Sequence, residues 1–157
     1  GYSAAFFAAA ADARIVTIER DEEMYREACQ NIEELGLGGQ ISCLPGDAEA
    51  VLLDLQKEVQ EGRRGPFDFV FIDAGKSHYT EFLSLALPML QDGALVLCDN
   101  ILMRGTTVSD EYDPKGKHKT NIRKMREFID WITSDERFVT TLYPIGDGIS
   151  CSIVKKK

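Results

Sequence analysis

The chain has 157 residues, of which 44% are hydrophobic and 28% are charged, and its net charge is -8 with a pI near 4.8. This size and apolar fraction predict one globular domain over residues 1–157. The acidic balance argues against a general nucleic-acid binder, and no apolar run approaches the roughly 20 residues of a membrane span. We therefore expect a soluble, cytoplasmic protein without a membrane partner.

The four cysteines show none of the close pairs that mark zinc or disulfide frameworks. Each lies within an apolar helical or extended pattern, so we expect reduced core thiols. They are Cys29, Cys43, Cys98 and Cys151.

The first predicted elements form a helix followed by a strand and a second helix. The Ala-rich helix begins directly at Gly1-Tyr2-Ser3, so we expect a strand and a glycine-rich turn to precede it in the fold. Residues 14–18 are a β-branched strand that ends in Glu19, and Asp21 opens a helix that Gly36 ends.

Two further strand and helix pairs follow. Residues 41–44 form a short strand before Asp47, and residues 67–72 form an apolar run that closes on Asp73. A helix is expected over residues 79–90, a turn over 91–93, and a last strand over 94–98 that ends in Asp99-Asn100. The alternation predicts an α/β fold with a mostly parallel, doubly wound sheet.

The remainder of the chain contains a loop, a helix and a hairpin. Residues 101–119 lack periodicity and follow a strand's carboxyl end, where long loops are often lids. Apolar spacing predicts a helix over 122–132, and the short link at 144–148 requires an antiparallel hairpin between 138–143 and 149–154.

Acidic side chains end two strands that a crossover should place side by side. Asp73, Asp99 and Asn100 offer only oxygen ligands, the set that suits a hard cation such as Mg²⁺, with Mn²⁺ or Ca²⁺ as alternatives. Lys76 lies close enough to Asp73 in the sequence to act as a general base near such a cation. The alternatives are turn-capping acids and a solvated lysine.

Two other acids follow strands in the first third of the chain. Glu19 lies where nucleotide-binding α/β folds place an acid for ribose hydroxyls, and it is equally suited to a solvated or capping role. Asp47 could accept a hydrogen bond from an adenine amino group, or cap the helix that follows.

Six short motifs together resemble the cation-dependent O-methyltransferases related to catechol and caffeoyl-CoA methyltransferases. The resemblance runs nearly end to end, and each motif alone is weak. The motifs are Gly1-Tyr-Ser-Ala, Thr17-Ile-Glu19-Arg-Asp, Gly46-Asp47-Ala48, Phe67-Asp-Phe-Val-Phe-Ile-Asp73-Ala-Gly-Lys76, Asp99-Asn100 and Pro144-Ile-Gly-Asp-Gly148.

This resemblance implies a seven-stranded, Rossmann-like methyltransferase sheet that uses S-adenosylmethionine. The metal then lies at Asp73, Asp99 and Asn100, the base is Lys76, and Asp73 also touches the cofactor. Glu19 holds the ribose. The methionine end of the cofactor lies near Gly1, Tyr2 and Ser3, and the adenine lies near Asp47 and Ala48.

Two departures from the family pattern bear on the acceptor. The family's first strand and N-terminal helices, which shape the acceptor pocket and a homodimer contact, would precede Gly1. The loop after Asn100 also lacks the aromatic residue that plant and animal relatives often place there. The resemblance as a whole still implies methyl transfer to a hydroxyl of a small, catechol-like acceptor.

The alternative acceptor is a hydroxyuridine in transfer RNA, because positive charge gathers in and after the loop of an otherwise acidic chain. The residues concerned are Lys115, Lys117, His118, Lys119, Arg123, Lys124 and Arg126. From other classes, an NAD-dependent dehydrogenase, a phospho-receiver domain and a non-catalytic α/β binding domain remain rival interpretations.

Overall fold

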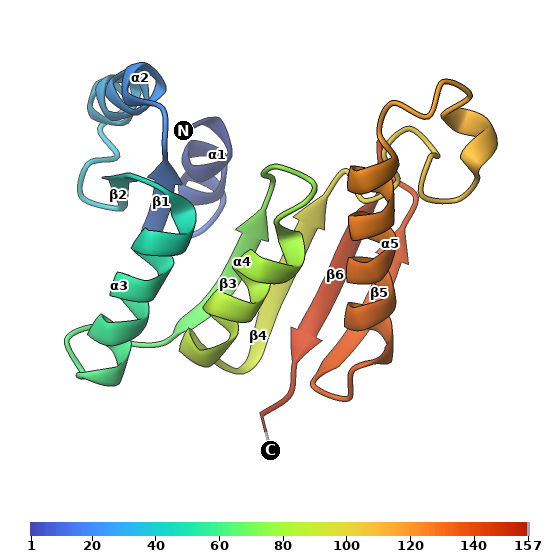
Figure 1. Cartoon of the computed structure of the whole chain (residues 1–157). Coiled ribbons are helices and arrows are strands. Elements are labelled where there is room, and N and C mark those ends of the chain that lie inside the picture. The colour runs from blue at the N-terminus through green and yellow to red at the C-terminus, as the bar shows by residue number, and fades with distance from the viewer. Residues whose placement is uncertain (157) are drawn as a thin grey trace. The chain divides into compact units, whose positions relative to one another are not determined.

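The computed structural model describes residues 1–156, and Figure 1 shows the elements along the chain. The chain divides into two compact units, with the boundary between Asp54 and Leu55. This boundary falls inside helix α3 (Ala48–Gln60). The single domain over residues 1–157 therefore stays a prediction.

The first unit begins as the sequence predicts, with helix, strand, helix and strand. Its elements are α1 (Tyr2–Ala10), β1 (Ile15–Glu19), α2 (Glu22–Glu34) and β2 (Ile41–Pro45). Strands β1 and β2 pair in parallel, with Glu19 opposite Pro45. A small core of Ala4, Ala8, Ile32 and Ile41 joins the two helices to this strand pair.

Helix α2 shows why local signals predicted its limits. The Asp21 carboxylate accepts hydrogen bonds from the amides of Glu23 and Met24, at 3.0 and 2.9 Å, and so satisfies two N–H groups that the helix leaves open. Gly36 has a φ of +69°, and the two hydrogen bonds that close the helix end run from Gly36 to Glu33 and from Leu37 to Ile32. Both predicted ends of this helix are confirmed.

The second unit is a four-stranded sheet with helices over it. Its strands are β3 (Phe67–Ile72), β4 (Leu90–Asp99), β5 (Phe138–Tyr143) and β6 (Ile149–Val154), in the order β3-β4-β6-β5. Strands β3 and β4 are parallel, whereas β6 is antiparallel to both β4 and β5. The predicted antiparallel hairpin at the sheet edge is therefore confirmed.

Helices α4 (Tyr79–Ala86) and α5 (Lys119–Ser134) lie over the same face of this sheet (Figure 1). Alternate residues of β4 point into the resulting core, where Ala94, Val96 and Cys98 are buried. The helices contribute Leu83 and Phe128, both fully buried. Because the core fixes these helices against the sheet, it also fixes the loops at the carboxyl ends of the strands.

The expectation for residues 79–93 is corrected at one point. Helix α4 ends at Ala86, because Pro88 has no backbone N–H, and a 3-10 turn, η1 (Leu87–Met89), follows. Residues 91–93 are not a separate turn, since β4 already begins at Leu90 and pairs with Phe67. The pairing then shifts to Leu95 opposite Phe69, so the ladder is irregular in this part of β4, where Gly93 has a φ of +78°.

The described residues thus form an α/β structure with six strands and five α-helices. The seven-strand count stays a prediction. Within residues 1–156, none of the helices is long and apolar enough to cross a membrane.

Candidate active site

The carboxyl ends of β3 and β4 bring the predicted acids together. Ile72 pairs with Cys98 in the parallel register, so Asp73 and Asp99 follow at neighbouring strand ends. Asp73 is exposed, whereas Asp99 and Asn100 are half-buried. The adjacency that the sequence predicted for these two strand ends is present.

Lys76 lies between two of the predicted ligand atoms. Its ammonium Nζ is 3.0 Å from Asn100 Oδ1 and 3.4 Å from Asp73 Oδ1. A third contact, at 2.7 Å, joins it to the hydroxyl of Tyr79. Only 21% of the lysine side chain is exposed, so this lysine belongs to the cluster and is not a solvated turn residue.

The backbone at Asn100 adopts the left-handed conformation, with a φ of 55°. Asparagine tolerates this conformation better than most residues do. The backbone N–H of Asn100 donates to Asp99 Oδ1 at 2.6 Å, and the backbone N–H of Ile101 donates to the carbonyl of Gly148. The turn after β4 is therefore held from two sides, and its shape directs the Asn100 amide oxygen toward Lys76.

Tyr79 is a member of this cluster that the sequence analysis assigned only to a helix face. Its side chain is fully buried, and its hydroxyl donates to the carbonyl oxygen of Asp99 at 2.8 Å. Burial, with the nearby Asp73 carboxylate, raises the pKa of this phenol above its ordinary value. The available signal was the spacing from Lys76, together with the need of a buried phenol for a polar partner.

The residues predicted to bind the cofactor lie in the first unit, apart from Asp73. Gly1 caps α1, and a Cβ at this position would be 3.2 Å from the Cβ of Ala28, so the close approach favours glycine. Tyr2 and Ser3 form the first turn of α1. Because α1 starts here, its first backbone N–H groups lie beside these three residues.

Glu19 and Asp47 lie near the same end of the β1–β2 pair, since Glu19 is opposite Pro45. Glu19 Oε1 accepts from the Asp21 amide at 2.9 Å. Asp47 Oδ1 accepts from the Glu49 amide at 3.0 Å, and Ala48 is the first residue of α3. Asp47 thus has the capping contact that was its alternative role, and both carboxylates remain exposed or partly exposed.

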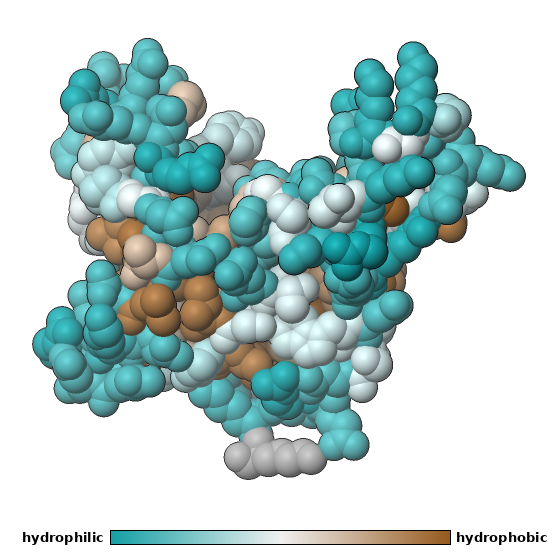
Figure 2. All heavy atoms as spheres, viewed as in Figure 1, coloured by the Kyte–Doolittle hydropathy of each residue, from teal (hydrophilic) through white to brown (hydrophobic). Residues whose placement is uncertain are grey.

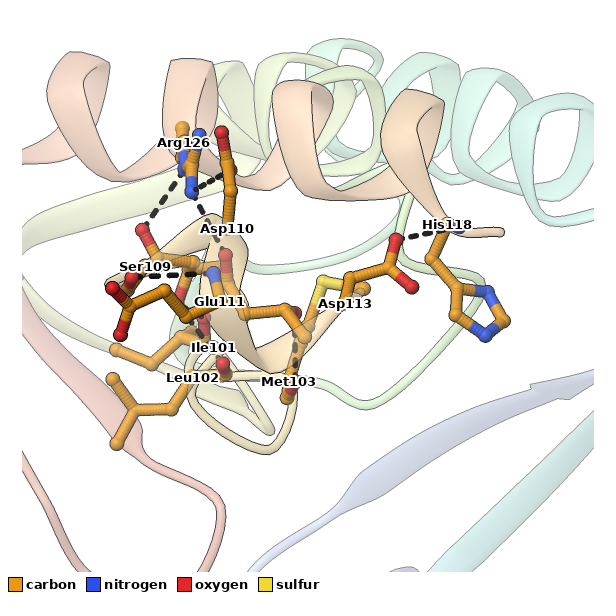
Figure 3. A network of polar contacts seen from close by, with 11 residues as sticks. Ile101, Leu102, Met103, Ser109, Asp110, Glu111, Asp113, His118 and Arg126 are labelled. Carbon is orange, nitrogen blue, oxygen red and sulfur yellow. Dashed lines mark hydrogen bonds and ion pairs between the residues drawn. The ribbon is translucent and has the colours of Figure 1, made fainter. Parts of the chain in front are cut away.

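The loop after the site, residues 101–118, carries hydrogen bonds along its length (Figure 3). Leu102 donates to the carbonyl of Asp147, and Arg126 of α5 donates to the carbonyls of Thr106 and Thr107, each at 2.9 Å. The Arg126 guanidinium also bonds to Asp110, at 2.8 Å. The role of the loop as a lid stays a prediction.

The basic residues of this region differ in their surroundings. Arg126 is engaged within the loop, and Arg123 bonds to Glu127 at 2.6 Å. The others are exposed at the start of α5 and before it, in a region whose visible surface is mostly hydrophilic in Figure 2. These exposed residues are Lys115, Lys117, His118, Lys119 and Lys124.

The parallel strands with acids at their ends and the antiparallel edge hairpin form an α/β fold, which the chain shares with solved O-methyltransferases. The sequence matches a family described as O-methyltransferase over residues 1–157. The chain therefore belongs to the O-methyltransferase family, as its motifs predicted.

Two relatives illustrate the sequence similarity. Caffeoyl-CoA O-methyltransferase 1 of Zea mays is 33% identical over 162 residues, which cover 99% of this chain and 61% of that protein. The catechol O-methyltransferase of Niastella koreensis is 37% identical over 112 residues, which cover 70% of this chain and 49% of that protein. The chain spans about half the length of the curated relatives it matches.

Solved structures agree with this membership. An O-methyltransferase from Bacillus cereus in complex with SAH matches with a TM-score of 0.74 and 26% identity, over 90% of this chain and 63% of that chain. The O-methyltransferase TomG from Streptomyces achromogenes in complex with SAM matches with a TM-score of 0.75 and 25% identity, over 92% of this chain and 63% of that chain.

Proposed function

We propose that the protein transfers a methyl group from S-adenosylmethionine to a hydroxyl of a small, catechol-like acceptor, with the help of a divalent cation. Family membership supports the reaction type, and the SAH and SAM in the two solved relatives support the cofactor. Relatives named for catechol and caffeoyl-CoA support a small acceptor. This membership also argues against the dehydrogenase and phospho-receiver interpretations.

One observation carries the catalytic part of the proposal. The Lys76 ammonium lies against Asn100 Oδ1 and Asp73 Oδ1, at the point where two strand ends bring oxygen donors together. These oxygen atoms already surround one positive charge, the Lys76 ammonium. Two carboxylates and one side-chain amide also form a ligand set that suits Mg²⁺. Asp73, Asp99 and Asn100 would hold that cation, with Mn²⁺ or Ca²⁺ as alternatives.

A bound divalent cation would supply Lewis acidity that makes an acceptor hydroxyl more acidic. Lys76, as the free amine, accepts the proton of that hydroxyl. The oxygen then attacks the methyl carbon of the sulfonium, the carbon–sulfur bond breaks, and S-adenosylhomocysteine is left. Glu19, with the residues around Gly1 and Asp47, binds the nucleoside and so orients the methyl group, because this reaction depends mainly on positioning.

Methyl transfer from labelled S-adenosylmethionine tests the proposal directly. The protein is incubated with a panel of catechols and with bulk transfer RNA, each with and without a chelator. We expect labelled catechol only when the divalent cation is present. Transfer that persists in the chelator would remove the cation from the mechanism, and S-adenosylmethionine that gives no labelled product with any acceptor would contradict the methyltransferase assignment.

Transfer RNA is the second candidate acceptor, favoured by the exposed lysines around the start of α5. Counterion release makes phosphate binding weaken steeply as salt concentration rises. Affinity for transfer RNA that falls with salt, together with label in the RNA, would favour this acceptor over a catechol. Neutralising Lys117 and Lys119 should then reduce the salt dependence, whereas transfer to catechols should not change.

A further inference from the structure

The hydroxyl of Tyr79 has a position that the protein core determines. The side chain is 0% exposed, and its ring packs edge to face on Phe128, with 5.5 Å between the ring centroids. Tyr79 is also the first residue of α4, which lies against the sheet. Packing therefore restricts the movement of the phenol, and a group hydrogen-bonded to its hydroxyl is held in place.

Two hydrogen bonds of this hydroxyl have defined directions. Its single proton is donated to the backbone carbonyl of Asp99, at 2.8 Å. A carbonyl can only accept, so the hydroxyl oxygen is left as the acceptor for the Lys76 ammonium, at 2.7 Å. The ammonium also lies 5.0 Å from the centroid of the Tyr79 ring, a distance at which the ring attracts a cation.

The other two partners of Lys76 are proposed cation ligands, Asn100 Oδ1 and Asp73 Oδ1. An ammonium and a divalent cation repel each other and compete for the same lone pairs. A cation bound to both oxygens would therefore weaken the contacts of Lys76 with them. Among the hydrogen-bond partners of the ammonium within residues 1–156, the Tyr79 hydroxyl is the one outside the proposed ligand set.

We propose that Tyr79 is a positioning residue, whose hydroxyl retains the Lys76 amine beside the ligand set when a divalent cation takes over Asp73 and Asn100. This inference rests on the proposed function, because it assumes that a cation binds there. Tyr79 touches neither the acceptor nor the cofactor in this role. Its effect reaches the reaction through Lys76 alone.

A double-mutant cycle separates this role from a structural one. Mg²⁺ binding is measured by calorimetry for the wild type, Tyr79→Phe, Lys76→Met and the double variant. Tyr79→Phe should weaken Mg²⁺ binding by roughly tenfold, because the Tyr79 hydroxyl is the partner left to Lys76 in the bound state, whereas Asp73 and Asn100 also hold Lys76 in the metal-free state. Lys76→Met should strengthen binding, since the competing ammonium is gone. In the Lys76→Met background, Tyr79→Phe should change the affinity by less than about twofold.

The control is Tyr112→Phe, in which an exposed tyrosine outside the cluster loses the same hydroxyl. An equal loss of Mg²⁺ affinity from Tyr79→Phe in both backgrounds would overturn the inference, since Tyr79 would then act through the Asp99 carbonyl. Unchanged affinity in Tyr79→Phe would overturn it as well. If the wild type itself binds no Mg²⁺, the cation-dependent function fails and the inference with it, an outcome distinct from the other two.

Discussion

At the scale of the residue, Lys76 combines a buried stem with three polar partners, which is the environment of a working amine and not of a solvated side chain. In the proposed reaction the lysine removes the acceptor proton, whereas the oxygen atoms around it bind the divalent cation. Removing the amine should therefore affect turnover without loss of the cation or the cofactor.

The first prediction concerns Lys76→Ala. Turnover should fall by roughly 10²- to 10⁴-fold, as for loss of a general base, and the defect should shrink as the pH approaches the acceptor's own pKa. The measurement is a pH profile of the turnover rate at saturating Mg²⁺. Lys124→Ala, which removes an exposed lysine of α5, serves as the control. A Lys76→Ala profile that coincides with the wild type would return this lysine to a solvated role.

At the scale of the element, strand β4 buries a thiol whose ionisation opposes folding. Burial raises the pKa of Cys98 to about 12, against roughly 8.5 in an unfolded chain. Between these values the unfolded chain loses the proton and the folded protein keeps it, so stability is full below about pH 8.5 and falls as the pH rises toward 12. The loss from this one group, once the pH reaches about 12, is on the order of 5 kcal/mol.

The second prediction is that the free energy of unfolding falls less steeply with rising alkaline pH in Cys98→Ala than in the wild type. The difference in slope should correspond to about one proton. Urea midpoints between pH 8 and pH 11 measure it. Cys151→Ala, which removes a less buried thiol from the neighbouring strand β6, is the matched control. Equal slopes for wild type and Cys98→Ala would mean that this thiol already ionises in the folded state.

The third prediction concerns helix α5 and the loop that it holds. Arg126→Ala deprives two carbonyls of a charged donor, which costs on the order of 1–3 kcal/mol, nearer the lower figure because 38% of the arginine side chain is exposed. Amide hydrogen exchange over residues 101–118 should become faster, while exchange in β4 should not change. Arg123→Ala, whose partner Glu127 lies on the same helix, is the control. Loop exchange that is equally slow in both variants would show that Arg126 does not hold the loop.

At the scale of the whole molecule, Glu19 and Asp47, proposed for the nucleoside, belong to one compact unit, and the residues proposed for the cation belong to the other. The fourth prediction is that the variants separate accordingly. Glu19→Gln should weaken S-adenosylhomocysteine by about 1 to 3 kcal/mol and leave Mg²⁺ binding as it is. Asp99→Asn should abolish Mg²⁺ binding only, whereas Asp73→Asn should weaken both ligands.

Calorimetry with each ligand measures these effects, and Glu27→Gln, an exposed acid of α2, is the control. Weaker S-adenosylhomocysteine binding in Asp99→Asn, or none of the expected loss in Glu19→Gln, would contradict the assignment of the acids to their ligands.

The sequence by itself determined what depends on neighbours along the chain. Asp21 and Gly36 fixed the ends of α2, because a capping side chain and a positive φ are local requirements. The alternation of strands and helices determined the α/β class, and acids directly after apolar runs marked the strand ends that form the candidate site. Its motifs also determined the family.

Only the tertiary structure decided which distant groups meet. The contact between Lys76 and Asn100 joins residues 24 positions apart, and it depends on the register of β3 with β4. The contact of Arg126 with the carbonyls of the loop likewise depends on how α5 packs. The residues around Gly93 have the composition of a turn, and only their pairing with β3 places them within strand β4. Tyr79 entered the site because α4 packs its ring into the core, and burial obliges its hydroxyl to find partners. Such contacts arise from strand register and helix packing, which periodicity within one segment does not specify.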